Sequence, residues 1–401
     1  MQRWNIHYWL LAALLMMPCI SLAAEGTPSG PGKSAVTMPA ELATAMTEYR
    51  LKLKEYKRAR QEYDDQAAAY WNSVAEKRRA RNAKRSANEE IVLTDYVLTQ
   101  PPVYTGPPEP VNPEKGVPEP PPLRKYIPVV ADFLRAAKEQ FDFTPQMPKS
   151  EIEFKRAYAK VAAAVGLTKD QIVRIYGFES GGDGRYDVQA GLEYPKPDAR
   201  AISTAVGYNQ LLNTNSVELL AEQCDNFVAA LRKKAASLEG KPKEVLDSKI
   251  EVLERMIAVS KSVPDDWNKH EELAYTPKGL GIHALNLDID VGPLLQTQKL
   301  LDSVVFARRK GYPKPLTAAE LEMMNLTGDG NGFDMVTMPP ELRGKVPTSN
   351  FFQPSGYAAN SVASENDTVA KLIAATDVII AATTTRFTVS ASAAALSPCG
   401  S

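Results

Sequence analysis

Glu179 stands at a position where its carboxyl group could keep a proton at neutral pH. Glu179 ends an apolar, helix-period segment that carries Ile172, Ile175 and Phe178, and Ser180 and two glycines follow it. A carboxyl group at an apolar helix end is poorly solvated, which favours its protonated form. Such a group can act as a general acid at neutral pH, which is the chemistry of glycosidic bond cleavage. A glutamate beside two glycines also fits a simple capped turn.

A second motif, Ala205-Val-Gly-Tyr-Asn-Gln-Leu-Leu212, follows this segment. With Glu179-Ser180 it resembles the lytic transglycosylase and goose-type lysozyme superfamily, in which a Glu-Ser helix end precedes a Gly-x-x-Gln stretch that lines the glycan cleft. The resemblance covers roughly residues 151–360. It implies a lysozyme-like helical domain in which Glu179 protonates the glycosidic oxygen and then acts as a base.

The candidate substrate-binding residues are Ser180, Asp187, Tyr208, Gln210, Asn325 and Tyr357, and of these the resemblance implies Ser180, Gln210 and Asn325. Gln210 would form hydrogen bonds with acetamido sugars, and Ser180 would steady the glutamate. Asp187 is either a second carboxylate that positions water or a solvated surface group. Tyr357 either supplies an aromatic hydroxyl or packs in the core. The loop 193–198 is expected to cover the cleft.

The chain departs from the family pattern at Met324, where the family usually has a tyrosine that helps hold the catalytic carboxyl, and at Tyr208-Asn209. The sequence is therefore consistent with two functions. The first is a peptidoglycan-cleaving lytic transglycosylase, or a muramidase-type glycosidase if water replaces the sugar hydroxyl as nucleophile. The second is a catalytically weak or inactive glycan-binding or scaffold protein of the cell envelope.

No residue pattern points to a metal or another cofactor. His270 and His283 lack the ligand spacing of a zinc site. Residues 329–334 resemble the start of a calcium loop but have Phe333 at its fifth position and no glycine at its sixth, so a glycine-rich turn is expected. Cys224 lies in the apolar stripe of its segment and reads as a core residue.

The N-terminus has the anatomy of a secretory signal peptide over residues 1–24, which predicts an exported, periplasmic or secreted protein. A flexible lead-in should follow over residues 25–38. The 47 Lys and Arg residues nearly balance the 48 Asp and Glu residues, which argues against a dedicated nucleic-acid binder.

Residues 39–98 are predicted to form a long, coiled-coil-like helical region. Its apolar positions alternate in steps of three and four and include many tyrosines, which suits self-association, an antiparallel helix pair or docking on another envelope protein. Residues 77–85 contain six cations, either a solvated helix face or a surface for an anionic polymer.

A proline-rich linker is predicted over residues 99–128, as an extended spacer before the lysozyme-like domain at 129–360. That domain should be all-α, because its apolar stripes follow helical periods with almost no alternating strand signal. The C-terminal segment 361–401 is rich in Ala, Ser and Thr. Its apolar part, 369–382, is interrupted by charges, so we expect a helix packed on the domain rather than a membrane span.

Overall fold

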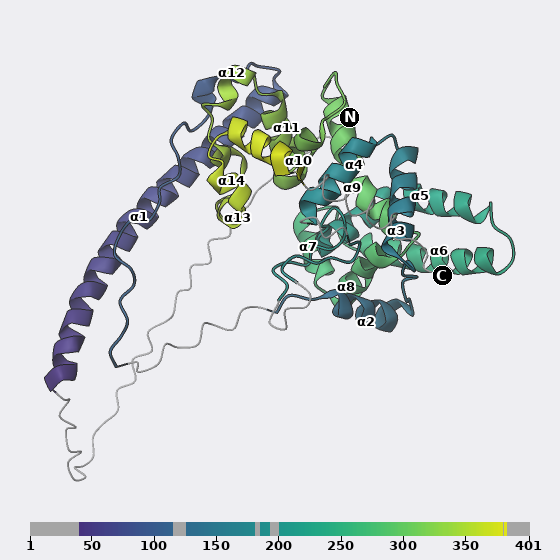
Figure 1. The fold of residues 1–401 in the computed structure, drawn as a ribbon, viewed down its shortest axis with the longest axis horizontal. Helices are drawn as coiled ribbons and strands as arrows, with labels where there is room; N and C mark the ends of the chain where they lie inside the picture. The colour runs from purple at the N-terminus through teal and green to yellow at the C-terminus, as the bar shows by residue number, and fades with distance from the viewer. Residues whose placement is uncertain (1–39, 115–125, 181–184, 193–199, 380, 383–401) are drawn as a thin grey trace, which may run out of the picture. The chain divides into compact units, whose positions relative to one another are not determined.

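The structure, a computed structural model, describes residues 40–114, 126–180, 185–192, 200–379 and 381–382 (Figure 1). The predicted signal peptide and lead-in, Gly181 and Gly182, the loop 193–198 and the tail from 383 lie outside the described residues. The described chain is mostly helical and contains no β-strand, which confirms the all-α class.

The elements, in chain order, are α1 (Ala40–Ser86), η1 (Leu93–Asp95), α2 (Val130–Phe141), α3 (Glu151–Ala164), α4 (Lys169–Glu179), α5 (Asn213–Ala235), α6 (Lys241–Ser260), α7 (Trp267–Ala274), α8 (Pro277–His283), η2 (Ala284–Leu287), α9 (Gly292–Arg309), α10 (Ala318–Thr327), α11 (Asp329–Thr337), α12 (Pro340–Arg343), η3 (Thr348–Phe351), α13 (Pro354–Ala359) and α14 (Ser361–Glu365). The chain divides into two units. The first contains residues 1–54 and 110–118, and the second contains 55–109 and 119–401.

Local sequence signals place the helix that carries Glu179. The side chain of Ser150 accepts a hydrogen bond from a first-turn amide of α3, and Gly166 follows that helix with a φ of 81°, which favours glycine. Thr168 and Gln171 then form a capping box at the start of α4. Each of these boundaries rests on contacts within a few residues, so the local sequence marks it.

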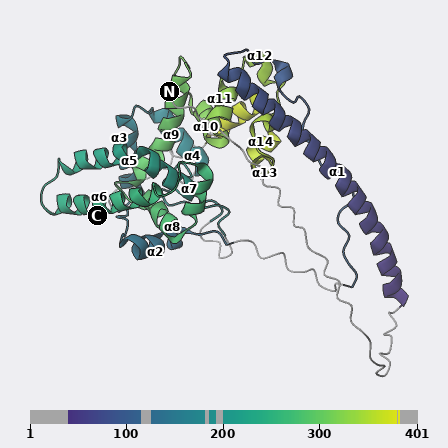
Figure 2. The same cartoon turned by 180° about the vertical axis from the view of Figure 1, so that it is seen from behind.

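Two buried apolar clusters form the core of the second unit. One gathers side chains mainly from α3, α4, α9, α10 and α11 with residues 346–372. The other gathers side chains mainly from α2, α5, α6, α8 and η2. Figures 1 and 2 show α5 and α6 as neighbours in a helical hairpin, in agreement with their shared cluster. Cys224 is buried in this second cluster, as predicted for a core residue.

The basic run 77–85 is largely occupied by contacts within the chain. The Arg81 side chain is fully buried, donates to the carbonyls of Asp95 and Asn350, and lies 4.4 Å from the Tyr96 ring centroid. Arg85 forms an ion pair with the buried Asp334 of α11. The expected solvated helix face is therefore wrong for most of this run, because its cations fasten the end of α1 to the C-terminal segments.

Part of the proline-rich segment lies along α1. The ring of Tyr104 makes edge contacts with those of Tyr56 and Tyr63, at centroid distances of 6.4 and 5.5 Å. The hydroxyl of Tyr70 donates to the carbonyl of Thr99 at 3.0 Å. These contacts use tyrosines of the expected coiled-coil seam, while self-association through residues 39–98 stays a prediction.

The core extends past residue 360. Residues 369–379 are helical, and Val369 and Leu372 are fully buried in the cluster that contains α10 and α11. The amide of Val369 also donates to the carbonyl of Val346 at 3.0 Å. A helix packed on the domain was expected here. Within the described residues, no helix has the length and apolar character needed to cross a membrane.

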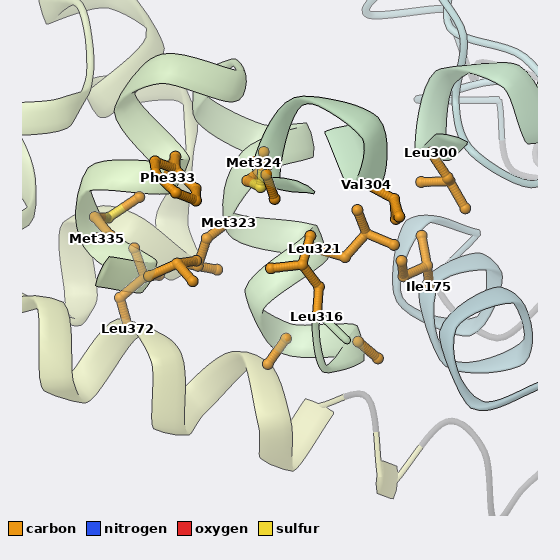
Figure 3. Close-up of a cluster of buried hydrophobic side chains, with 14 of the residues drawn as sticks. Ile175, Leu300, Val304, Leu316, Leu321, Met323, Met324, Phe333, Met335 and Leu372 are labelled. Atoms are coloured by element: carbon orange, nitrogen blue, oxygen red, sulfur yellow. The ribbon is translucent and has the colours of Figure 1, made fainter. Parts of the chain in front are cut away.

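The helices α10 and α11 touch through their backbones. A Cβ atom at Gly332 would lie 2.3 Å from the Cα of Met324. Figure 3 shows Met324, Phe333 and Met335 with side chains of α4, α9 and the 369–379 helix in one apolar cluster. Residues 329–337 are thus a helix, and the expectation of a glycine-rich turn over 329–334 is wrong, since Gly332 allows helix packing there.

Arg81→Ala should lower the free energy of unfolding by about 3 kcal/mol, because it opens a cavity and removes a guanidinium from a buried ionic cluster. Arg79→Ala is the matched control, since Arg79 is exposed on the same helix, and should change stability by less than about 0.5 kcal/mol. Urea denaturation of the full chain measures both. Equal effects would contradict the buried role of Arg81.

Gly332→Ala should lower the free energy of unfolding by about 1–3 kcal/mol, since the added methyl must push α10 away from α11. Gly344→Ala is the control, because a Cβ at Gly344 meets no atom within 4 Å. Urea midpoints compare the two variants. A neutral Gly332→Ala would show that α10 and α11 can separate without cost.

Candidate functional site

Glu179 lies on the apolar face of α4. It follows Ile172, Ile175 and Tyr176 at helical spacing, and all three are buried. Part of the Glu179 side chain reaches the surface, but its carboxyl group is enclosed by protein. It also sits at the C-terminal end of the helix, where the helix dipole disfavours a negative charge.

Helix α10 presents two polar residues to this carboxyl group. Asn325 Nδ2 donates to Glu179 Oε1 at 2.5 Å. Glu322 precedes Asn325 by three positions, which places both on one side of the helix. The Glu322 side chain is fully buried and interacts with Glu179 through its carboxyl group. Leu321 and Met324 of the same helix lie in the apolar cluster.

The two buried carboxyl groups disfavour each other's ionisation. Loss of solvent is the main cause that raises the pKa of Glu179 to about 7, while hydrogen bonds from Glu322 and Asn325 and the charge of Lys299 on α9 oppose this shift. Burial also raises the pKa of Glu322 well above its ordinary value, and the adjacent Glu179 raises it further. At neutral pH the pair therefore holds at least one proton.

Tyr208 does not offer its side chain to a ligand. It is fully buried, its ring stacks on that of Tyr176 at 4.7 Å, and its hydroxyl donates to Glu151. Substrate binding through Tyr208 is therefore a wrong prediction, because the aromatic core takes up both the ring and the hydroxyl.

Gln296 of α9 packs against the turn at Gly207 and forms hydrogen bonds with its backbone. A Cβ at Gly207 would lie 2.7 Å from Gln296 Nε2. Gln296 donates to the carbonyl of Val206 and accepts from the amide of Asn209. Gly207 thus allows the close approach of a buried side chain of the protein itself.

Gln210 and Asp187 are engaged in local contacts. Gln210 has a φ of 44°, and its side-chain amide donates to the carbonyls of Gly207 and Val188. Asp187 accepts two hydrogen bonds from Arg185, at 2.9 and 3.0 Å. Gln210 therefore stabilises its own turn. Asp187 pairs with Arg185, a partner that the prediction of a water-positioning carboxylate did not include.

Ser180 and Tyr357 also have structural roles. The hydroxyl of Ser180 donates to the carbonyl of Tyr176 and closes the end of α4, so Ser180 steadies the backbone beside Glu179. Tyr357 is buried, and its ring packs against those of Trp71 and Phe352. The core role left open for Tyr357 is the one that the structure supports.

Sequence reasoning missed Glu322 as the second carboxyl group. Its signal was a glutamate placed directly between Leu321 and the pair Met323-Met324, three positions before Asn325, where a charged residue on a core-forming helix is rare. Asp187 drew attention instead because it is near Glu179 in sequence. The pairing of Glu179 with Glu322 spans α4 and α10, and local spacing cannot reveal such a contact.

The described residues contain no group of three or more His, Cys, Asp and Glu side chains arranged to hold a metal ion. Two cavities of about 380 and 560 Å³ lie elsewhere, one between α5 and α6 and one beside α6 and α8, and Glu179 lines neither. The site is therefore defined by its side chains rather than by these cavities.

Glu179→Gln should stabilise the protein relative to wild type as pH rises. The folded wild type has a raised pKa at Glu179, so its stability falls between about pH 4.5 and 7 while the variant lacks this loss. We expect the difference in unfolding free energy to grow by roughly 1–3 kcal/mol between pH 5 and 8.

Urea denaturation at several pH values measures this difference. Glu139→Gln, an exposed position on α2, is the control and should show no such trend. A pH-independent difference for Glu179→Gln would contradict the buried, protonated carboxyl group.

Comparison with known proteins adds no assignment to this geometry. No family model matches the sequence, and no curated protein matches it significantly. The residues that bear on a function are therefore those of the site itself, above all Glu179, Glu322 and Asn325.

Proposed function

We propose that this chain is an exported, peptidoglycan-cleaving enzyme of the lytic transglycosylase type that cuts the bond between N-acetylmuramic acid and N-acetylglucosamine. The observation that supports it most is the carboxyl group of Glu179, which is enclosed at a helix end and has its pKa raised to about 7. A carboxylic acid poised near neutral pH is suited to both halves of an acid and base cycle.

In the proposed reaction, Glu179 first donates its proton to the glycosidic oxygen, and the bond from that oxygen to the anomeric carbon breaks. The acetamido group of the sugar assists at the anomeric carbon. The Glu179 carboxylate then accepts the proton of the sugar's own C6 hydroxyl as that oxygen bonds to the anomeric carbon. The products are a new chain end and a 1,6-anhydro ring, and Glu179 regains its proton.

The arrangement of carboxyl groups favours this route over inverting hydrolysis. An inverting glycosidase separates its two carboxyl groups by about 6.5–9.5 Å, so that a water molecule fits between substrate and base. Glu322 instead lies beside Glu179 and interacts with its carboxyl group, and Asp187 is paired with Arg185. Neither carboxyl group is placed as a separate base for water.

Asn325 supports the charge that Glu179 acquires. Its amide donates to Glu179 Oε1, and a hydrogen bond of this kind strengthens when the acceptor becomes a carboxylate. The proton transfer is therefore easier than it would be in a purely apolar pocket.

A second candidate is a glycan-binding or scaffold protein of the cell envelope with little turnover. Met324, which stands where the resembled family has a tyrosine, is buried in the apolar cluster, and Tyr208 and Gln210 are engaged in internal contacts. Two positions expected to contact sugar, Tyr208 and Gln210, therefore serve the fold, which favours a reduced glycan-binding set. Product analysis separates the two candidates.

Mass spectrometry of the soluble products from purified peptidoglycan should detect anhydro-ended muropeptides with the wild-type protein and none with Glu179→Gln. Glu139→Gln, prepared in parallel, should release the same products as wild type. The absence of released fragments from folded wild-type protein would contradict the enzyme, and binding to sedimented peptidoglycan would then support the scaffold.

A further inference from the structure

Glu322 is a buried carboxyl group whose one nearby donor is Asn325, among the described residues. Both of its oxygens are shielded from solvent, and neither meets hydrogen-bond geometry with an N–H or hydroxyl group of the described residues. The side chains that act on it are Glu179 from α4 and Asn325 from its own helix. Asn325 lowers the pKa of Glu322 as a hydrogen-bond donor, but its amide is shared, since it donates to Glu179 Oε1 at 2.5 Å. An ionised Glu322 would thus have one shared donor, fewer than a buried carboxylate requires.

Among the described groups, no cation offsets the charge that an ionised Glu322 would carry. Lys299 of α9 acts on Glu179, but no charge interaction of a cation with Glu322 is found among the described groups. If both glutamates were ionised, two like charges would face each other in a poorly solvated pocket. A proton on Glu322 removes this repulsion, removes the need for further donors to Glu322 and lets its hydroxyl donate to Glu179.

We propose that Glu322 keeps its proton at neutral pH and donates it in a hydrogen bond to Glu179, which makes Glu322 a positioning residue for that carboxyl group. The proton stays on Glu322 whether Glu179 is protonated or ionised. The hydrogen bond strengthens when Glu179 becomes a carboxylate, so it stabilises the charge that develops as Glu179 gives its proton away.

The catalytic meaning of this pair rests on the proposed function, whereas the retained proton does not. The first experiment therefore follows the protonation state without any substrate. The full-length protein, labelled with ¹³C at the glutamate side-chain carboxyl carbons, is titrated by NMR as wild type, Glu179→Gln and Glu322→Gln.

In wild type we expect two glutamate signals that titrate well above the ordinary range of glutamate. In Glu322→Gln one of them disappears, and the signal of Glu179 keeps its midpoint to within about 0.5 pH units, because a neutral donor replaces a neutral donor. In Glu179→Gln the signal of Glu322 stays in its protonated position at pH 7. A Glu322 signal already ionised at pH 6, or a fall of the Glu179 midpoint by one unit or more in Glu322→Gln, would overturn the proposal.

A second experiment measures cleavage of peptidoglycan by the two variants at position 322. Glu322→Gln keeps a side-chain donor and should lower kcat about threefold, whereas Glu322→Leu lacks the donor and should lower it about 100-fold with KM little changed. Without the donor, the pH above which activity declines should also rise, since the Glu179 carboxylate loses stabilisation. Equal losses in both variants would overturn the positioning role.

The titration and the cleavage assay distinguish a failure of the positioning role from a failure of the proposed function. If the titration shows the retained proton but no peptidoglycan is cleaved, the carboxyl pair stands and the proposed function fails. If peptidoglycan is cleaved but Glu322 titrates as an ordinary glutamate, the proposed function stands and the positioning role fails. Glu322→Leu is judged by activity only after its urea midpoint shows that it folds.

Discussion

The site depends on two carboxyl groups that face each other with little solvent. Glu179 at the end of α4 and Glu322 on α10 cannot both ionise at neutral pH without a large electrostatic cost, so the fold retains a proton between them. A retained proton near neutral pH is what a general acid requires. The same arrangement lowers stability as pH rises, which a purely structural core would avoid.

Much of the remaining fold keeps α4 and α10 in place. Gly332 lets α11 approach the backbone of α10, and Phe333 and Met335 pack into the shared apolar cluster. Arg85 of α1 pairs with Asp334 on α11. The basic end of α1 thus fastens the helix that supports α10, and a cationic run whose surface role was undecided from sequence becomes part of the framework of the site.

The sequence predicts the helices better than the site. Ser150, Thr168 and Gln171 mark helix starts through contacts within one turn, so spacing alone reveals them. The motif that contains Tyr208 and Gln210 resembles one that lines a glycan cleft. In the structure, however, Tyr208 donates to Glu151, which is distant in sequence, and Gln210 donates to the carbonyl of Val188 from a local turn. Tertiary contacts decided these roles, and no periodicity encodes them.

The most direct test of the account is a crystal structure of Glu179→Gln with a bound peptidoglycan oligosaccharide. The account predicts a glycosidic oxygen about 3 Å from the side chain of residue 179, with Asn325 and Glu322 still directed at that side chain. An oligosaccharide bound elsewhere, or a glycosidic bond separated from residue 179 by other protein groups, would contradict the central claim that Glu179 is the acid that cleaves a glycan.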